Sequence, residues 1–246
     1  MKTPEYIILT PIAPGKLYSL NRFLKNVISF EPRPREMVFC AEPEIVPQLS
    51  GWEQRLKKQG IKLVIFTLEP EIINKYPNLS IEKISYSREY LRHYFINSQF
   101  EWALWLDSDI IPKSNIAKTL LKMAYSEKFL AITNQYPGKE KNSHWSGIGC
   151  TLTCKTACAL SRFWIAPIIW KGKRIGNISE DYCFLAMLDA GARALKNRVG
   201  MEEWKGRKVG KFVSVYHEIK PGVTRFLKKD IKSGGLGNPY FPSYSE

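Results

Sequence analysis

Apolar and polar residues along the first 106 positions follow two alternating patterns. Short, almost wholly apolar runs are typical of strands buried on both faces of a sheet. Apolar residues spaced three and four apart are typical of helices that bury one face. This alternation predicts an α/β fold, with a mostly parallel sheet that carries helices on both faces. The predicted strands are 6–10, 36–40, 61–68 and 102–106, and the predicted helices are 17–30, 50–59 and 87–98.

The second half of the chain has a less regular pattern. Gly60 and Gly191 follow two predicted helices, and glycine is the residue that most often ends a helix. No repeat or linker divides the chain, so we expect one domain over residues 1–227. Residues 228–246 are rich in Gly, Pro, Ser and Lys and predict a flexible tail or lid. The further predicted strands are 129–133, 147–152 and 211–216, the helices are 116–125, 155–164 and 180–190, and 135–146 is a polar loop.

The composition of the 246 residues, 44% hydrophobic and 24% charged, excludes a disordered chain and a coiled coil. No apolar run approaches the ~18 to 20 residues that cross a bilayer. The longest run, 163–170, also contains Pro167. The first residues enter a strand-like run without the regions of a signal peptide. We therefore expect a soluble protein of the cytoplasm.

The chain has five cysteines, an odd number, and no secretion signal, so a disulfide framework is not expected. Three of them lie four residues apart, a spacing close to that of zinc ligands. A zinc site needs a fourth ligand and a loop that presents the set. Here the cysteines run through an apolar strand-to-helix stretch, which favours small buried thiols. The five are Cys40, Cys150, Cys154, Cys158 and Cys183.

Lysine and arginine total 37 against 23 aspartates and glutamates, which gives a formal net charge of +14. Such a charge fits nucleic acid, an anionic membrane or phosphorylated substrates. The basic residues are dispersed, and no helix-turn-helix, zinc finger or aromatic RNA-binding motif accompanies them. The sequence therefore argues against sequence-specific recognition of nucleic acid and leaves peripheral contact with an anionic membrane as an alternative.

Two carboxylates follow the most apolar predicted strand, 102–106, in the segment Asp107-Ser108-Asp109. Ligands of open α/β sheets bind at the carboxyl ends of the strands. Residues two apart share one face of a strand, so both carboxylates can point toward one cation. Oxygen ligands of this kind suit Mg²⁺ or Mn²⁺. The alternative is a turn in which an aspartate caps the following segment.

Two further polar groups stand at the ends of predicted elements. Ser179 precedes Glu180 and Asp181, and a serine cap followed by acids is also what an ordinary helix start favours. His217 follows an apolar strand-like segment, 213–216, where a lone histidine is more often a hydrogen-bonded residue than a ligand. Each of these features has an adequate structural explanation by itself.

Taken together and in this order, the segments resemble the nucleotide-sugar-dependent glycosyltransferases of the GT-A fold, most closely the inverting family 2. Asp107-Ser108-Asp109 is similar to the DxD motif of that family, and Glu180-Asp181 with the later Ala190-Gly191 is similar to its ED motif. The segment 146–152 resembles the glycine-containing stretch before the acceptor site, and His217 matches a late metal-binding histidine. The sequence departs from the family at Cys40-Ala41-Glu42-Pro43, where a glycine-serine turn is common, and in lacking an acceptor-helix tryptophan after Glu180-Asp181.

The resemblance implies a GT-A-like, Rossmann-like domain that transfers a hexose from a UDP- or GDP-sugar to a glycan, lipid-linked or protein acceptor, with inversion. It implies Mn²⁺ or Mg²⁺ held by Asp107, Asp109 and His217, with Asp181 as the general base and Glu180 as its alternate. It assigns Trp145 and Gly147 to the acceptor, although a core position is an equal alternative for the tryptophan. Arg88 and Arg92 also fit ordinary surface arginines. The residues assigned to the nucleotide sugar are Thr10, Pro11, Ile12, Glu42, Arg88, Arg92, Asp107 and Ser108.

Two other functions use some of the same residues. A metal-dependent nucleotidyltransferase or nuclease would use the carboxylates with a basic surface that grips nucleic acid. Sugar nucleotidyltransferases, however, begin with a glycine-rich loop after the first strand, and residues 10–15 do not form one. A non-catalytic carbohydrate- or membrane-binding module would not require the acids and the histidine to converge.

Overall fold

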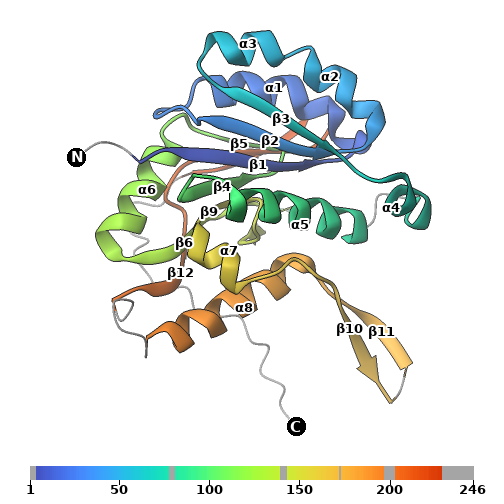
Figure 1. Ribbon diagram of the computed structural model, residues 1–246, viewed down its shortest axis with the longest axis vertical. Coiled ribbons are helices and arrows are strands. Elements are labelled where there is room, and N and C mark those ends of the chain that lie inside the picture. The colour runs from blue at the N-terminus through green and yellow to red at the C-terminus, as the bar shows by residue number, and fades with distance from the viewer. Residues whose placement is uncertain (1–3, 78–80, 139–142, 172, 197–202, 229–246) are drawn as a thin grey trace.

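The computed structural model describes residues 4–77, 81–138, 143–171, 173–196 and 203–228 of the chain. Its centre is a seven-stranded sheet in the order β12-β6-β9-β4-β1-β2-β3 (Figure 1). β9 runs antiparallel to both of its neighbours, and all other neighbouring strands pair in parallel. The predicted α/β fold with a mostly parallel sheet is therefore confirmed. The strands are β1 (Tyr6–Ile12), β2 (Glu36–Ala41), β3 (Lys62–Thr67), β4 (Trp102–Leu106), β6 (Phe129–Asn134), β9 (Cys150–Cys154) and β12 (Lys205–Gly210).

Helices cover both faces of the sheet (Figure 1). Apolar side chains of α1, α3 and α6 belong to the core on one face, those of α5 and the first turns of α8 belong to the core on the other, and α7 contributes to both. The short elements η1 (Pro14–Lys16), η2 (Pro43–Ile45), α2 (Val46–Ser50) and α4 (Pro70–Lys75) follow strand ends. The larger helices are α1 (Leu17–Ile28), α3 (Glu53–Lys58), α5 (Ile81–Asn97), α6 (Ile116–Glu127), α7 (Lys155–Leu160) and α8 (Glu180–Leu195).

The apolar runs in the strands follow from this two-sided burial. Successive residues of a strand point to opposite faces of the sheet. In β1, Tyr6 and Ile8 belong to the core on the α1 side, whereas Ile7 and Leu9 belong to the core on the α5 side. All four side chains are fully buried, so no polar position interrupts the run. The carboxyl end of this strand is therefore held rigidly at the centre of the sheet.

Three small sheets complete the described fold. β13 (Val215–Lys220) pairs antiparallel with β5 (Ile110–Pro112) and with β14 (Val223–Leu227). β7 (Tyr136–Pro137) pairs with β8 (His144–Trp145), and β10 (Ala166–Trp170) pairs with β11 (Lys173–Ile178). The predicted strand 211–216 is wrong in position, because residues 211–214 separate β12 from β13. His217 accordingly lies inside a strand rather than after one.

Several predicted boundaries also differ from the structure. The helix predicted at 50–59 is two helices, α2 and α3, separated at Gly51 and Trp52, although Gly60 does end α3 with a positive φ of 74°. α8 continues through Gly191 to Leu195, so this glycine does not end the helix. A Cβ atom at Gly191 would lie only 3.0 Å from Leu160, which shows that the glycine lets α8 pack closely on α7.

Further predictions concern the cysteines, the end of the chain and the membrane. All five cysteines are free and buried, so the prediction of small buried thiols is confirmed. The predicted flexible tail, 228–246, lies outside the described residues except for Lys228, and the single-domain boundary at residue 227 stays a prediction. Among the described residues, every helix is too short or too polar to pass through a bilayer.

Candidate active site

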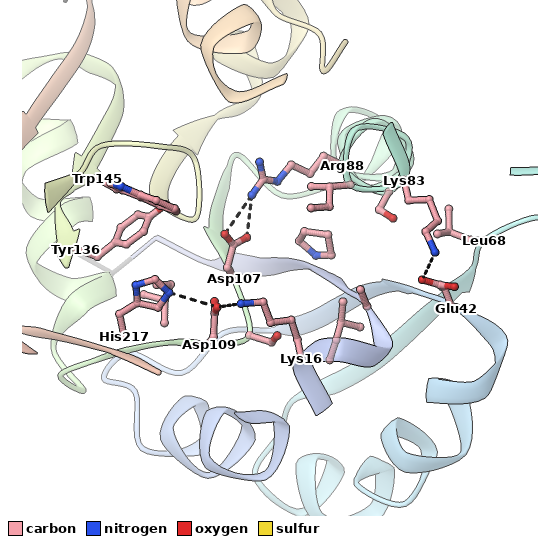
Figure 2. Close-up of a pocket in the computed structure, with 17 residues that line it drawn as sticks. Lys16, Glu42, Leu68, Lys83, Arg88, Asp107, Asp109, Tyr136, Trp145 and His217 are labelled. Atoms are coloured by element: carbon pink, nitrogen blue, oxygen red, sulfur yellow. Dashed lines mark hydrogen bonds and ion pairs between the residues drawn. The ribbon is translucent and has the colours of Figure 1, made fainter. Parts of the chain in front are cut away.

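A pocket opens at the carboxyl ends of β1, β2 and β4, where ligands of open α/β sheets bind (Figure 2). β1 contributes Pro11 and Ile12, and Glu42 follows β2. Asp107, Ser108 and Asp109 follow β4. Thus three segments that are far apart in the sequence meet because their strands are neighbours in the sheet. α5 closes a further wall with Lys83, Ser87 and Arg88, and Trp145 and His217 lie across from it.

Asp109 lies between two basic side chains. Its Oδ2 is 3.3 Å from Nε2 of His217 and forms an ion pair with Nζ of Lys16. The pairing of β13 with β5 places His217 opposite Ile110 and so beside Asp109. Burial alone would raise the pKa of Asp109, but the hydrogen bond with His217 and the charge of Lys16 lower it overall. Asp109 therefore stays ionised in a buried position.

The tautomer of His217 follows from its second contact. Its Nδ1 is 2.6 Å from the carbonyl oxygen of Pro137, which can only accept a hydrogen bond. Nδ1 therefore carries a proton, and Nε2 is the ring atom that faces Asp109: it donates to the carboxylate when the ring is protonated and presents a lone pair when the ring is neutral. Histidine ligands of metals in proteins are held in this way.

The residues present fit a divalent cation in part. Asp109 and His217 supply one carboxylate and one imidazole at a common point, and Mg²⁺ or Mn²⁺ often takes only one or two such groups together with phosphate oxygens. Asp107 instead turns toward Arg88 (Figure 2). Among the described residues, no three His, Cys, Asp or Glu side chains are grouped so that they could hold a metal ion. The three-residue metal site stays a prediction.

Arg88 joins three carboxylates at the side of the pocket. Its Nη2 donates to Oδ1 of Asp107 over 2.9 Å, and its Nη1 donates to Oε1 of Glu180 over 2.7 Å and also to Asp181. The arginine side chain is only 4% exposed, so these are buried ion pairs. The surrounding acids raise the pKa of Arg88 further, although burial opposes the rise. One fixed positive charge thus links the end of β4 to the start of α8.

The same cluster raises the pKa of two of its acids. Burial raises the pKa of Glu180 to about 7, against the opposing effect of Arg88. Burial also raises the pKa of Asp107, and the nearby charges of Asp109 and Asp181 add to the rise. A single guanidinium does not fully compensate three carboxylates in one place. A cationic group entering the pocket would therefore be attracted to them.

Two glycines make room for these carboxylates. A Cβ atom at Gly147 would lie 2.3 Å from Oδ2 of Asp181, and one at Gly149 would lie 2.2 Å from Oδ2 of Asp107. Both distances are far below van der Waals contact. The glycine-containing segment singled out in the sequence therefore lets two acids approach the backbone that precedes β9.

The two acids of α8 have different surroundings. Ser179 caps the helix as expected, and its Oγ accepts a hydrogen bond from the amide of Tyr182. Asp181 accepts a hydrogen bond from the amide of Ile148 over 3.1 Å, and its side chain is 23% exposed, against 7% for Glu180. Neither acid lines the pocket itself, but both pair with Arg88, which does. Asp181 is the more accessible of the two.

Some predicted nucleotide-binding residues lie away from the cavity. Thr10 is buried and donates its hydroxyl proton to the carbonyl oxygen of Leu106 over 2.8 Å, so it ties β1 to β4. Arg92 donates to the carbonyl oxygen of Cys158 and pairs with Glu89 on its own helix. Pro11, Ile12, Glu42, Arg88, Asp107 and Ser108 all line the pocket.

Among the pocket residues not found from the sequence, three make ion pairs or ring contacts. Lys83 pairs with Glu42 over 2.8 Å in a buried position, but it precedes the segment 87–98 that was predicted as helical. Lys16 belongs to η1, directly after β1, and a basic residue just beyond a strand end was the available signal. Tyr136 packs edge-on against the ring of His217, within the segment predicted as a polar loop. Trp145 lines the cavity with 41% of its surface exposed, so it is not a core residue.

Comparisons with known proteins bear on the fold. No protein-family model matches the chain, and no curated protein matches it. Among solved structures, the chain is similar to S. aureus TarS 1-349 in complex with UDP, with 7% identity and a TM-score of 0.50 over 74% of this chain and 54% of that one. It is also similar to the glycosyltransferase GlyE of Streptococcus pneumoniae TIGR4, with 9% identity and a TM-score of 0.47 over 84% of this chain and 45% of that one.

The chain spans from 30% to 66% of the length of the solved structures to which it is similar. Sequence identities of 7% to 10% are too low to carry a function from one protein to another. The likeness to the TarS structure at a TM-score of 0.50 shows a shared fold. The chain therefore has an α/β fold with a mostly parallel sheet, of the kind found in that structure.

Proposed function

We propose that this chain is a glycosyltransferase that moves a sugar from a nucleoside-diphosphate sugar to an acceptor hydroxyl. The observation that carries the proposal is the convergence of Asp107, Asp109 and His217 on one pocket at the strand ends. Arg88 links this pocket to Asp181. The shared fold with TarS, whose structure contains UDP, supports a nucleotide-sugar donor.

The pocket offers distinct groups to the parts of such a donor. Pro11, Ile12 and the buried pair of Glu42 with Lys83 form the end that suits a nucleobase and ribose. Lys16 and Arg88 offer hydrogen-bond donors to a diphosphate, and because the carboxylates around them outnumber these two charges, the phosphates would enter together with a divalent cation. Because both cations already pair with carboxylates, the donor phosphates would enter a network of fixed charges that needs little rearrangement.

A divalent cation fits this end of the pocket. Asp109 and Nε2 of His217 would hold Mn²⁺ or Mg²⁺ together with phosphate oxygens, and the ion would neutralise charge on the diphosphate leaving group. Nδ1 of His217 stays bonded to Pro137, which keeps the ring in the orientation that such an ion requires. Lys16 pairs with the same carboxylate and would stabilise the leaving group from the other side.

Asp181 is proposed as the general base of an inverting transfer. It is more exposed than Glu180, and its carboxylate is fixed by Arg88 and by the amide of Ile148. A base in this position would take the proton of the acceptor hydroxyl. Trp145, exposed at the pocket, offers an aromatic face on which an acceptor sugar can stack.

The test is an assay of nucleoside diphosphate release from a panel of UDP- and GDP-sugars, with Mn²⁺ and with EDTA. We expect release by the wild-type protein, and a loss of about 10² to 10⁴-fold for Asp181→Asn with donor binding retained. Glu101→Gln is the matched control, because its side chain is 72% exposed.

Three results would contradict parts of the proposal. Full turnover by Asp181→Asn with an inactive Glu180→Gln would exchange the roles of the two acids. A product that keeps the anomeric configuration of the donor would exclude inversion. Cleavage of nucleic acid without release from any sugar nucleotide would favour the metal-dependent nuclease instead.

A further inference from the structure

The hairpin formed by β10 and β11 extends away from the rest of the described molecule. Figure 1 shows it projecting beyond the start of α8, clear of the central sheet and its helices. Its root is fixed, because Phe163 stacks on Phe184 of α8 with ring centroids 4.3 Å apart. Phe163 is buried, whereas residues 164–169 are half-buried or exposed. The hairpin is therefore an anchored projection.

Large apolar side chains are exposed along this projection. Trp164 is 53% exposed, and Ile168 and Ile169 are 41% and 56% exposed. Ile168 and Ile169 are consecutive in β10 and point to opposite faces of the hairpin, so each face exposes a large apolar side chain that costs free energy in water and serves no core. Large apolar side chains exposed together on one projection mark a segment that contacts another apolar phase.

The charged residues around these side chains are all basic. The segment 161–179 contains four basic residues and no acidic residue. Lys171 and Lys173 lie on either side of the hairpin turn and are both exposed. The projection therefore combines apolar side chains with positive charge at its tip.

We propose that the β10–β11 hairpin docks on the surface of an anionic lipid bilayer. The isoleucines and Trp164 would enter the interfacial region, where tryptophan is favoured, while Lys171 and Lys173 contact anionic headgroups. Charge complementarity favours this partner over an apolar protein groove, which would leave the lysines without counter-charges. The exposed isoleucines favour a bilayer over nucleic acid, because nucleic acid would leave them in water.

The position of the hairpin bears on the acceptor. β11 ends at Ile178, and Ser179 and the acids Glu180 and Asp181 follow at once. A membrane bound to the hairpin would therefore lie near the end of α8 that carries these acids, and lipid-linked hydroxyls would be the acceptors at hand. The acceptor class assigned in this way is a lipid-linked sugar or alcohol. The assignment rests on the proposed function, whereas membrane docking does not.

The experiment is co-sedimentation of the full chain with vesicles of phosphatidylcholine alone and of phosphatidylcholine with phosphatidylglycerol, at low salt and without any donor. We expect binding to the anionic vesicles only. Ile168→Ser with Ile169→Ser should weaken it by at least about tenfold. Lys171→Glu with Lys173→Glu should do the same. The control is Lys57→Glu with Lys58→Glu in α3, which removes the same charge from another exposed surface.

The outcomes separate this proposal from the proposed function. Unchanged circular-dichroism spectra and thermal midpoints show that the hairpin variants fold, whether or not the chain binds UDP. Equal sedimentation of wild type and both hairpin variants would overturn the proposal, as would a wild type that ignores anionic vesicles. Equal losses in the α3 control would show that net charge rather than the hairpin directs binding, which also overturns it. A dimer that the isoleucine variant dissociates would assign the surface to a second copy of the chain.

Discussion

Two glycines at the beginning of the β9 region decide how closely the acids of the site approach the backbone. At Gly147, a Cβ atom would collide with the carboxylate of Asp181, the proposed base. We expect Gly147→Ala to displace that carboxylate and to lower the transfer rate by about 10²-fold, while donor binding changes little. The measurement is kcat for transfer beside calorimetry of the donor.

Gly51→Ala is the control for this substitution. A Cβ atom at Gly51 would meet only ordinary contacts, at 3.6 Å and beyond, and the position lies outside the pocket. It should leave the transfer rate unchanged. A Gly147→Ala variant with full activity would show that the position of the Asp181 carboxylate in this fold is unimportant for the reaction.

Glu180 predicts a pH dependence of stability. Burial raises the pKa of its carboxyl to about 7, whereas a glutamate in an unfolded chain titrates at ~4.3. Between these values the folded protein binds more protons than the unfolded chain, so this group makes stability fall as the pH rises. We expect the thermal midpoint of the wild type minus that of Glu180→Gln to decrease as the pH rises from about 4.5 to about 7. Parallel curves for the two proteins would contradict the raised pKa.

At the scale of elements, α5 and α8 are joined to the end of β4 through Arg88. Removing one partner of a buried ion pair leaves uncompensated charge, at a cost of about 3 to 5 kcal/mol. Arg88→Met leaves three carboxylates without their common partner, so we expect a loss of that size in the free energy of unfolding. Denaturant unfolding measures it. Arg22→Met, at a side chain that is 45% exposed, should cost less than about 1 kcal/mol, and equal losses would contradict the argument.

The position of β13 shows why one strand was misplaced in the sequence analysis. Phe212 and Val213 are buried, so the apolar pattern there is real. The backbone of Val213, however, bonds with the side chain of Asn134, which both donates to its carbonyl oxygen and accepts from its amide. A side-chain amide thus takes the place of a neighbouring strand. This contact joins residues far apart in the sequence. The spacing of apolar residues therefore does not predict where β13 begins.

The β10–β11 hairpin had no clear sequence signal. The run 163–170 is apolar, and a continuous apolar run normally predicts burial. The structure exposes Ile168 and Ile169 on a projection instead, since Ser161 leaves the helical conformation and ends α7. The period of an apolar pattern indicates an element, but it does not indicate what the element packs against.

Across the whole molecule, the parallel half of the sheet was predictable and the assembled site was only partly so. β1, β2 and β4 are almost fully buried runs and β3 is a mostly half-buried one, and their order with the helices fixes a parallel sheet whose strand ends face one side. The position of the β4 end in such a sheet therefore predicted that Asp107 and Asp109 face a ligand-binding crevice. The partners of these acids, Lys16 and Arg88, come from an irregular segment and from a helix whose register depends on packing, so their pairings followed only from the structure.

The central claim is that the pocket at the strand ends binds a nucleoside diphosphate through Asp109 and its neighbours, and one calorimetric titration tests it most directly. UDP and GDP are titrated in the presence of Mn²⁺ into the wild-type protein, into Asp109→Asn and into the control Glu101→Gln. We predict saturable binding of at least one of the two nucleotides, unchanged in the control and weakened by at least about tenfold in Asp109→Asn. Equal affinities of the wild type and Asp109→Asn, or no binding of either nucleotide by the wild type, would contradict the account.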